Sequence, residues 1–134
     1  MILGARFVDR TAPRGTRVDA VNLSSSNALW EMIVDHSIRV PHFMEILSRC
    51  FGIILLSIGD RLACAQFTGA TGDPPYLMVV SQVGNQEQYR EFLMGNEPTP
   101  VPTRYCVPAE IAADVAVHFL ERGGLLPDVT WEAL

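Results

Sequence analysis

Three side chains in this sequence have the chemistry of a nucleophile and its base: Cys106, His118 and His42. Cys106 precedes a segment expected to be helical, and the N-terminus of a helix stabilises a thiolate. A cysteine enzyme also needs a histidine within hydrogen-bond reach of the sulfur. No motif assigns either histidine to that role. The residues therefore favour a protein without catalytic groups and leave a thiol-dependent enzyme as an alternative.

The other candidates for chemistry have simpler structural interpretations. The histidines and carboxylates show no spacing typical of a zinc site, such as His-Glu-x-x-His. Gly69 and Gly72 lack the lysine of a phosphate-binding loop and are interpreted as part of a turn. A hydrogen-bonded packing role is expected for His118, and surface positions are expected for His36 and His42. We therefore expect no metal and no cofactor.

Composition and charge limit the class of partner. The chain has 134 residues, of which 49% are apolar, enough for one hydrophobic core and a single domain over residues 1–134. Its net charge is −5 and its isoelectric point is near 5.0. Nucleic-acid binding normally requires a basic surface, so we expect no nucleic acid among the partners. An acidic domain is instead suited to a basic protein partner.

The cysteines and the apolar segments indicate the compartment. Cys50, Cys64 and Cys106 are an odd number without Cys-x-x-Cys spacing, which argues against a disulfide framework and for a reducing environment. The first residues lack the apolar core of a signal peptide. The most apolar stretch, residues 51–58, is far shorter than the ~20 residues of a membrane span. We expect a cytoplasmic protein that has no contact with a membrane.

The first third of the chain is predicted to contain two short strands and two helices. The strands are expected over residues 2–8 and 18–23, with a turn between them. Residues 24–27, Ser-Ser-Ser-Asn, offer N-caps for a helix whose apolar side chains recur at helical spacing. A second short helix is predicted over residues 42–49.

Consecutive strands are predicted in the middle of the chain. The apolar run at 51–58 is typical of a strand covered on both faces, and Gly59-Asp60 turns it into a strand at 61–67. After a loop at 69–75, further strands are expected at 76–81, 89–94 and 101–107, the last at a sheet edge because it contains Pro102.

The last helix has clear boundaries. Pro108 suits its first turn, and Gly123 allows the left-handed backbone that ends many helices. A short strand is expected to follow at residues 129–132. Strands in runs, with helices before and after, predict an α+β fold: a mainly antiparallel sheet on which an early and a late amphipathic helix pack.

The second half of the sequence also carries a family pattern. A strand–Gly-Asp–strand hairpin and a tyrosine-containing strand precede Val107-Pro108, Phe119, Gly123 and the closing Pro127-x-Val129-x-Trp131. Over residues 51–132 this pattern resembles the first-described family of immunity proteins from bacterial polymorphic toxin systems, several of which accompany deaminase toxins. The N-terminal third resembles that family only in the order of its elements.

The resemblance implies an antitoxin. Such a protein binds a cognate toxin domain, here one that attacks nucleic acid or deaminates, and blocks its activity. Because the helices and apolar strands are expected in the core, the partner is expected to bind exposed loops and the hairpin that begins at residue 89. The acidic and aromatic residues of those segments are the candidate partner-binding residues: Asp73, Tyr76, Glu87, Tyr89, Glu91 and Glu97.

Three other functions stay open on the sequence. An adaptor or chaperone would escort a secreted effector without inhibiting it. A thiol-dependent enzyme would use Cys106 with His118 or His42, and its sign would be a lowered Cys106 pKa beside a ligand-sized cleft. A small-ligand sensor would show a closed apolar pocket with convergent polar groups. Oligomeric state is open as well.

Overall fold

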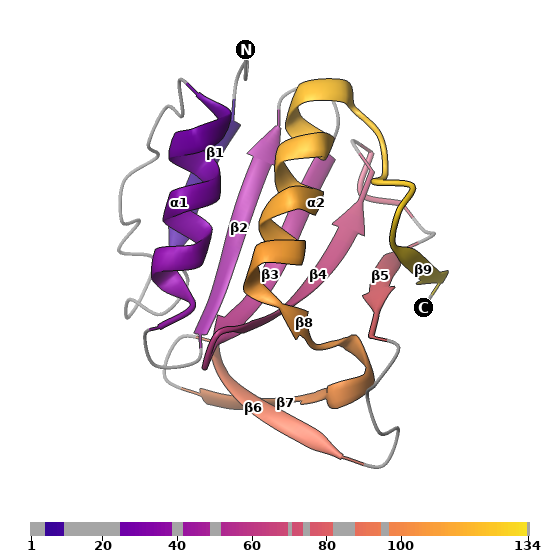
Figure 1. Cartoon of the computed structure of the whole chain (residues 1–134). Coiled ribbons are helices and arrows are strands. Elements are labelled where there is room, and N and C mark those ends of the chain that lie inside the picture. The colour runs from indigo at the N-terminus through magenta and orange to yellow at the C-terminus, as the bar shows by residue number, and fades with distance from the viewer. Residues whose placement is uncertain are drawn as a thin grey trace.

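Nine strands form one sheet in the part of the chain that the computed structural model describes, residues 5–9, 25–38, 42–48, 52–69, 71–73, 76–81, 88–94 and 97–133 (Figure 1). The strands are β1 (Ala5–Asp9), β2 (His42–Ser48), β3 (Gly52–Gly59), β4 (Leu62–Thr68), β5 (Leu77–Val80), β6 (Tyr89–Met94), β7 (Glu97–Pro102), β8 (Val107–Pro108) and β9 (Thr130–Ala133). The helices are α1 (Ser26–His36) and α2 (Ala109–Arg122), and a 3₁₀ turn, Thr103–Tyr105, follows β7. The predicted α+β fold, with an early and a late helix, is confirmed.

The sheet runs in the order β7-β6-β2-β3-β4-β5-β9, with β1 also paired to β2 and β8 to β4. Every pairing is antiparallel except a short parallel contact between β2 and β6. The outer edge of β4 is shared: its first residues pair with β8, and residues near its end pair with β5. This division brings the segment that follows β7 back beside the start of β4.

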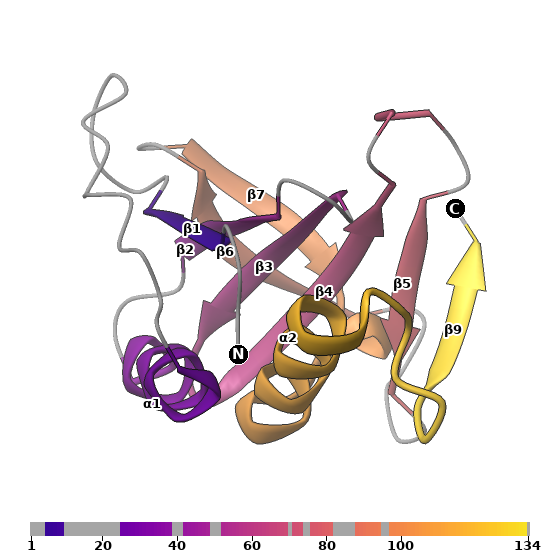
Figure 2. The same cartoon turned by 90° about the horizontal axis from the view of Figure 1, so that it is seen from above.

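The two helices pack side by side on one face of the sheet (Figure 2). The hydroxyl of Ser25 accepts a hydrogen bond from the Ala28 amide at 3.1 Å and caps α1, as the serine run predicts. Gly123 ends α2 with φ 73°, as predicted. Among the described residues no helix has the length and hydropathy of a membrane span, and the longer one, α2, has 14 residues.

The main core lies between these helices and the sheet. Alternate residues of β3 and β4 point into it, and small residues on α2 let that helix approach closely. The rings of Phe67 and Phe119 meet edge to face with centroids 5.5 Å apart. The fully buried members of this core include Leu29, Ile33, Ile54, Leu56, Ile58, Ala63, Ala65, Ala112, Ala116 and Phe119.

The opposite face of the sheet is covered by the β6–β7 hairpin and the 3₁₀ turn rather than by a helix (Figure 2). Phe92 and Val101 point from the hairpin toward the sheet, and Tyr105 follows from the turn. They pack against β4 and β5 through Cys64 and Met78. The protein therefore has two cores, one on each face of the same strands.

Some sequence predictions about the elements were wrong. Residues 42–48 form strand β2, not a helix, because pairing with β1 and β3 along the whole segment outweighs its weak local preference. His36, expected at the surface, is buried. The partner of β6 begins at Glu97 rather than Val101 and ends at Pro102. The strand predicted over 18–23 lies outside the described residues.

Candidate functional site

The structure separates the predicted partner-binding residues into two groups. Tyr89, Glu91 and Glu97 lie on the β6–β7 hairpin, at the end of the sheet where β3 turns into β4 (Figure 1). Asp73 and Tyr76 flank the β4–β5 connection, at the other end of β4. Seven residues of a strand span roughly 20 Å, so the two groups are far apart. Glu87 lies outside the described residues.

The outer hairpin face, defined as Tyr89, Glu91, Pro98 and Pro100, is the exposed side of the β6–β7 ladder. The register sets Tyr89 opposite Pro102 and Glu91 opposite Pro100, so these side chains share one face. Tyr89 is 63% exposed, and one of only two large apolar side chains exposed within the described ranges. Glu91 is also exposed. Exposed aromatic groups are enriched at the centre of protein interfaces and polar groups surround them at the rim, so this face is a candidate protein-binding surface.

The free edge of this hairpin does not accept another strand. The Thr103 amide donates to the Gln88 carbonyl at 2.9 Å, which makes that pair a hydrogen-bonded one in the β6–β7 register. Since such pairs alternate with non-hydrogen-bonded ones, Pro98, Pro100 and Pro102 all occupy positions whose nitrogen points to the free edge. Proline has no N–H, so this edge lacks its outward donors. The face of the hairpin is therefore a better candidate for a binding surface than its edge.

Asp73 and Tyr76 have a different environment. The Tyr76 hydroxyl donates to the Gly72 carbonyl at 3.0 Å, and this bond closes the β4–β5 loop. Gly72 has φ 77°, in the left-handed region that glycine tolerates. Asp73 is exposed. This end of the sheet is a folded loop with one acid, a weaker candidate surface than the hairpin.

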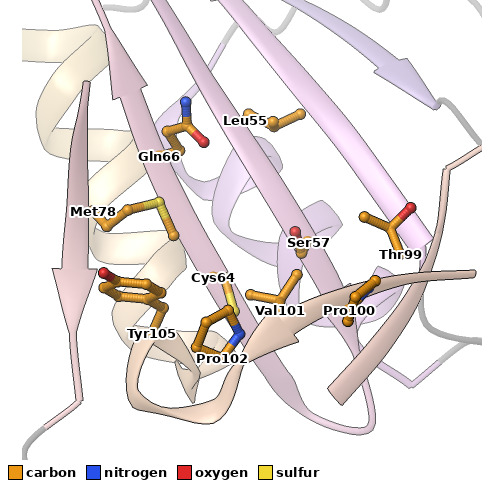
Figure 3. Close-up of a pocket in the computed structure, with 10 residues that line it drawn as sticks. All are labelled: Leu55, Ser57, Cys64, Gln66, Met78, Thr99, Pro100, Val101, Pro102 and Tyr105. Atoms are coloured by element: carbon orange, nitrogen blue, oxygen red, sulfur yellow. The ribbon is translucent and has the colours of Figure 1, made fainter. Parts of the chain in front are cut away.

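A pocket of about 270 Å³ lies between the sheet and the hairpin (Figure 3). Its walls come from β3, β4, β5, β7 and the 3₁₀ turn, and Figure 3 shows the helices behind the sheet and the lining side chains in front of it. None of the lining side chains is charged. They are Leu55, Ser57, Cys64, Gln66, Met78, Thr99, Pro100, Val101, Pro102 and Tyr105.

Ser57 is the unusual group in this pocket. It is 5% exposed, and its hydroxyl has no hydrogen-bond partner among the described residues. A buried hydroxyl without a partner is destabilising by about 1–3 kcal/mol relative to a satisfied one. Such groups are uncommon in native proteins and point to water or a ligand that supplies the missing bond.

Tyr105 forms one wall of the pocket and is held by charged neighbours. Its hydroxyl accepts from the Arg104 guanidinium at 2.8 Å and donates to a Glu132 carboxylate oxygen at 3.1 Å. Arg104 and Glu132 also form an ion pair, and the guanidinium lies 4.7 Å from the Tyr105 ring centroid. Because Glu132 belongs to β9, this network ties the 3₁₀ turn to the far strand of the sheet.

Cys64, which lines the pocket, is in contact with a second thiol, that of Cys106. The sulfurs of Cys64 and Cys106 are 3.0 Å apart, and both side chains are buried. A hydrogen bond with Cys106, together with burial, raises the pKa of the Cys64 thiol. The same hydrogen bond lowers the pKa of Cys106, and the Arg90 guanidinium acts in the same direction. Burial opposes the shift at Cys106, and either sulfur can donate in this hydrogen bond, so the contact itself is the feature that distinguishes the two thiols from ordinary buried cysteines.

The partner of Cys106 is thus a cysteine and not a histidine. His118 belongs to α2, which packs on the opposite face of the sheet. It is half-buried and makes no hydrogen bond with the described part of the chain, so the predicted hydrogen-bonded role is not found. The side chain of His42 lies outside that part. No group of three potential metal ligands occurs among the described residues.

No protein-family model matches this sequence, and comparison with curated proteins gives no match either. The site therefore rests on its geometry. Sequence reasoning named Tyr89 and Glu91, which the structure places on the outer hairpin face, and did not single out Ser57, Cys64 or Tyr105. The predicted strand at 61–67 contained a signal for these residues. Side chains alternate along a strand, so Cys64 and Gln66 are expected on the face opposite Ala63 and Ala65.

Proposed function

We propose that this chain is an immunity protein, an antitoxin that binds a cognate bacterial toxin domain through the outer hairpin face and blocks its activity. The observation that carries the proposal is the 63% exposed Tyr89 beside Glu91 on a ribbon with a proline-blocked edge. Tyrosine is enriched among the residues that dominate binding energy at protein interfaces. We propose a cytoplasmic location as well, because an antitoxin acts in the compartment where its toxin would act.

Charge supports a toxin that acts on nucleic acid or its bases. Toxins of that class present a basic groove to their substrate. With a net charge of −5, this chain has the complementary sign, which accelerates encounter and disfavours other acidic partners. Arg90 forms an ion pair with Asp60, whereas Glu91 and Glu97 are exposed acidic residues of the hairpin.

The test is co-purification of the whole chain with the toxin domain encoded beside it, followed by toxin activity with and without the chain. We expect a stoichiometric complex and loss of activity. A complex in which the toxin stays active would favour an adaptor or chaperone instead. Absence of a complex would remove both binding roles.

The surface is tested by paired substitutions at the two ends of the sheet. Tyr89→Ala and Glu91→Arg should each weaken toxin binding. The expected loss of affinity for Tyr89→Ala is roughly 30-fold, the effect of removing a binding hot spot. Asp73→Arg makes the same charge change as Glu91→Arg at the distant loop and should alter the dissociation constant less than about threefold. Calorimetry measures all three. The reverse ranking would move the interface to the β4–β5 end.

A second candidate function is small-ligand binding in the pocket, which the unpartnered Ser57 hydroxyl favours. The uncharged lining suits a small neutral molecule with one hydrogen-bonding group. Phenol and n-hexanol are suitable probes, with binding followed by NMR shifts of the pocket methyl groups. Ser57→Ala should weaken phenol binding about fivefold, the worth of one hydrogen bond, and Ser25→Ala on α1 should leave it unchanged. If phenol binds Ser57→Ala and Ser25→Ala equally well, the Ser57 hydroxyl does not bind the ligand and the pocket is not a specific ligand site.

A further inference from the structure

The contact between Cys64 and Cys106 is closer than packing alone requires. Their sulfurs are 3.0 Å apart, shorter than the ~3.5–4.0 Å of ordinary nonbonded carbon contacts. The Cys106 sulfur also lies 3.9 Å from the Pro102 carbonyl oxygen, at the end of β7. The two cysteines belong to segments 42 residues apart in the sequence, so the contact is a product of the fold.

Strand pairing holds the cysteines in the geometry of a cross-strand bridge. Continuing the register of β4 and β8 by one residue sets Cys64 opposite Cys106. The Ala109 amide donates to the Arg61 carbonyl, so alternation along the ladder makes the cysteine position a non-hydrogen-bonded one. Facing residues at such positions have Cα atoms about 4.5 Å apart. That separation is within the ~4.4–6.8 Å range of protein disulfides.

We propose that Cys64 and Cys106 are an oxidation site, at which hydrogen peroxide converts the two thiols into an intramolecular disulfide. The bridge fastens the segment that follows β7 to β4, beside the pocket that Cys64 lines. It forms in response to oxidant and differs from the permanent disulfide framework that the cysteine count argues against. In a reducing compartment, disulfides of this transient kind are typical of redox sensing. The site does not depend on which partner the hairpin binds.

The reaction balances in two steps. The Cys106 sulfur, as thiolate, attacks one peroxide oxygen; the O–O bond breaks, and hydroxide leaves and takes up a proton to become water. Cys106 is then a sulfenic acid. The Cys64 sulfur attacks the Cys106 sulfur, the S–O bond breaks, and a second water leaves with the Cys64 proton. Two thiols have lost two electrons, and one peroxide has become two waters.

The surroundings divide the two roles between the cysteines. Cys106 is 7% exposed and is the more accessible of the two sulfurs, so we assign it the attack on peroxide; the lowered pKa that its hydrogen bond with Cys64 produces agrees with this role. Cys64 is 1% exposed and keeps its proton until the second step. Cys64 also lines the pocket of about 270 Å³ that lies beside the pair. Because the second sulfur is already in contact, bridge formation competes well with further oxidation of the sulfenic acid.

The test treats the whole reduced chain with hydrogen peroxide, then alkylates it in denaturant and measures its mass. Untreated chain should take up one alkyl group at each of its three cysteines. Treated chain should be lighter by two hydrogens, take up one alkyl group, and yield a cross-linked peptide containing Cys64 and Cys106. Its melting temperature should rise by roughly 10 °C and return on reduction, since the bridge closes a long loop.

Variants at the three cysteines supply the controls. Cys50→Ser should behave as the parent chain does. Cys64→Ser should lose the bridge and accumulate a sulfenic acid at Cys106 that reacts with dimedone, whereas Cys106→Ser should show neither product. If a serine variant fails to fold, the peptide map of the peroxide-treated chain without substitutions still shows whether Cys64 and Cys106 are joined. Three alkylated cysteines after treatment, a bridge to Cys50 or between chains, or sulfinic acid without a bridge would overturn the proposal.

Discussion

The two faces of the sheet are built from the same strands but from different kinds of side chain. Along β4, Ala63 and Ala65 point toward the helices, and Cys64 and Gln66 point toward the pocket. The fully buried side chains of the helix face are aliphatic groups and Phe119, which have no hydrogen-bonding requirement. The pocket face contains thiols, amides and hydroxyls beside a cavity.

This difference divides the work of the molecule. A close-packed apolar layer stabilises a fold but offers nothing for a ligand or an oxidant to act on. A smaller apolar layer that encloses a cavity and includes a few thiol, amide and hydroxyl groups contributes less to stability and provides reactive groups in a sheltered site. The helix face thus fixes the strands, and their other side is free to carry chemistry.

The largest expected effect comes from breaking the helix face. Phe119 is fully buried and touches Phe67, so Phe119→Ala should lower the free energy of unfolding by about 3–5 kcal/mol. Urea unfolding measures this change. Glu121→Ala, at an exposed position of the same helix, should stay within about 0.5 kcal/mol of the parent. A loss below about 1 kcal/mol for Phe119→Ala would mean that this face is not the main core.

On the pocket face, a polar contact and not packing should be the sensitive feature. Tyr105→Phe removes the hydroxyl that links Arg104 to Glu132, and should cost about 1–2 kcal/mol in urea unfolding. Tyr76→Phe removes a hydroxyl whose bond closes an exposed loop, and should cost less than about 0.5 kcal/mol. A loss of stability for Tyr105→Phe as small as that expected for Tyr76→Phe would show that the Tyr105 hydrogen bonds do not stabilise the pocket wall.

Two serines sharpen the contrast at a smaller scale. Ser25→Ala removes the cap of α1 and should cost about 1 kcal/mol. Ser57→Ala removes an unpartnered hydroxyl from the pocket and should leave stability unchanged or raise it by up to about 1 kcal/mol. Thermal unfolding of both variants in one buffer gives the comparison. A clear loss for Ser57→Ala would reveal a partner for its hydroxyl and remove the support for a ligand.

The smallest expected effect is a gain in stability from a substitution in the β3–β4 turn, which supports both faces of the sheet. Asp60 and Arg61 have φ of 52° and 63°, the backbone of a two-residue hairpin turn that prefers glycine in its second position. Arg61→Gly relieves the left-handed strain at some entropic cost, for a net gain of about 0.5 kcal/mol. Arg61→Ala keeps the strain and should show no gain. Chemical denaturation measures the stability of both variants. Unchanged phenol binding in both shows that the pocket is intact.

Local signals in the sequence predicted much of the fold. The serine run marked the start of α1, Pro108 and Gly123 bounded α2, and apolar runs marked β3, β4 and β5. The segment at 42–48 was misread because seven residues with scattered apolar groups fit either period, and only its neighbours decide. His36 was misassigned because nothing near it in sequence reveals the packing that buries it.

The candidate site was less predictable, for a physical reason. The outer hairpin face depends on two adjacent strands, and Tyr89 and Glu91 could be identified from them. The pocket draws on four separate segments, and Cys64 in its lining contacts a cysteine 42 residues away in the sequence. Such a site depends on strand order, which local patterns do not specify.

The two-residue turn at Asp60 and Arg61 also limits how this sequence can evolve. It sets Gly59 opposite Leu62 and so fixes which residues of β4 face the helices. A single inserted residue that shifted β4 by one position would exchange the two faces, sending Cys64 and Gln66 into the apolar core. Relatives of this protein should therefore tolerate substitutions along β4 but keep the length of this turn, and vary in length elsewhere, as at the β4–β5 loop.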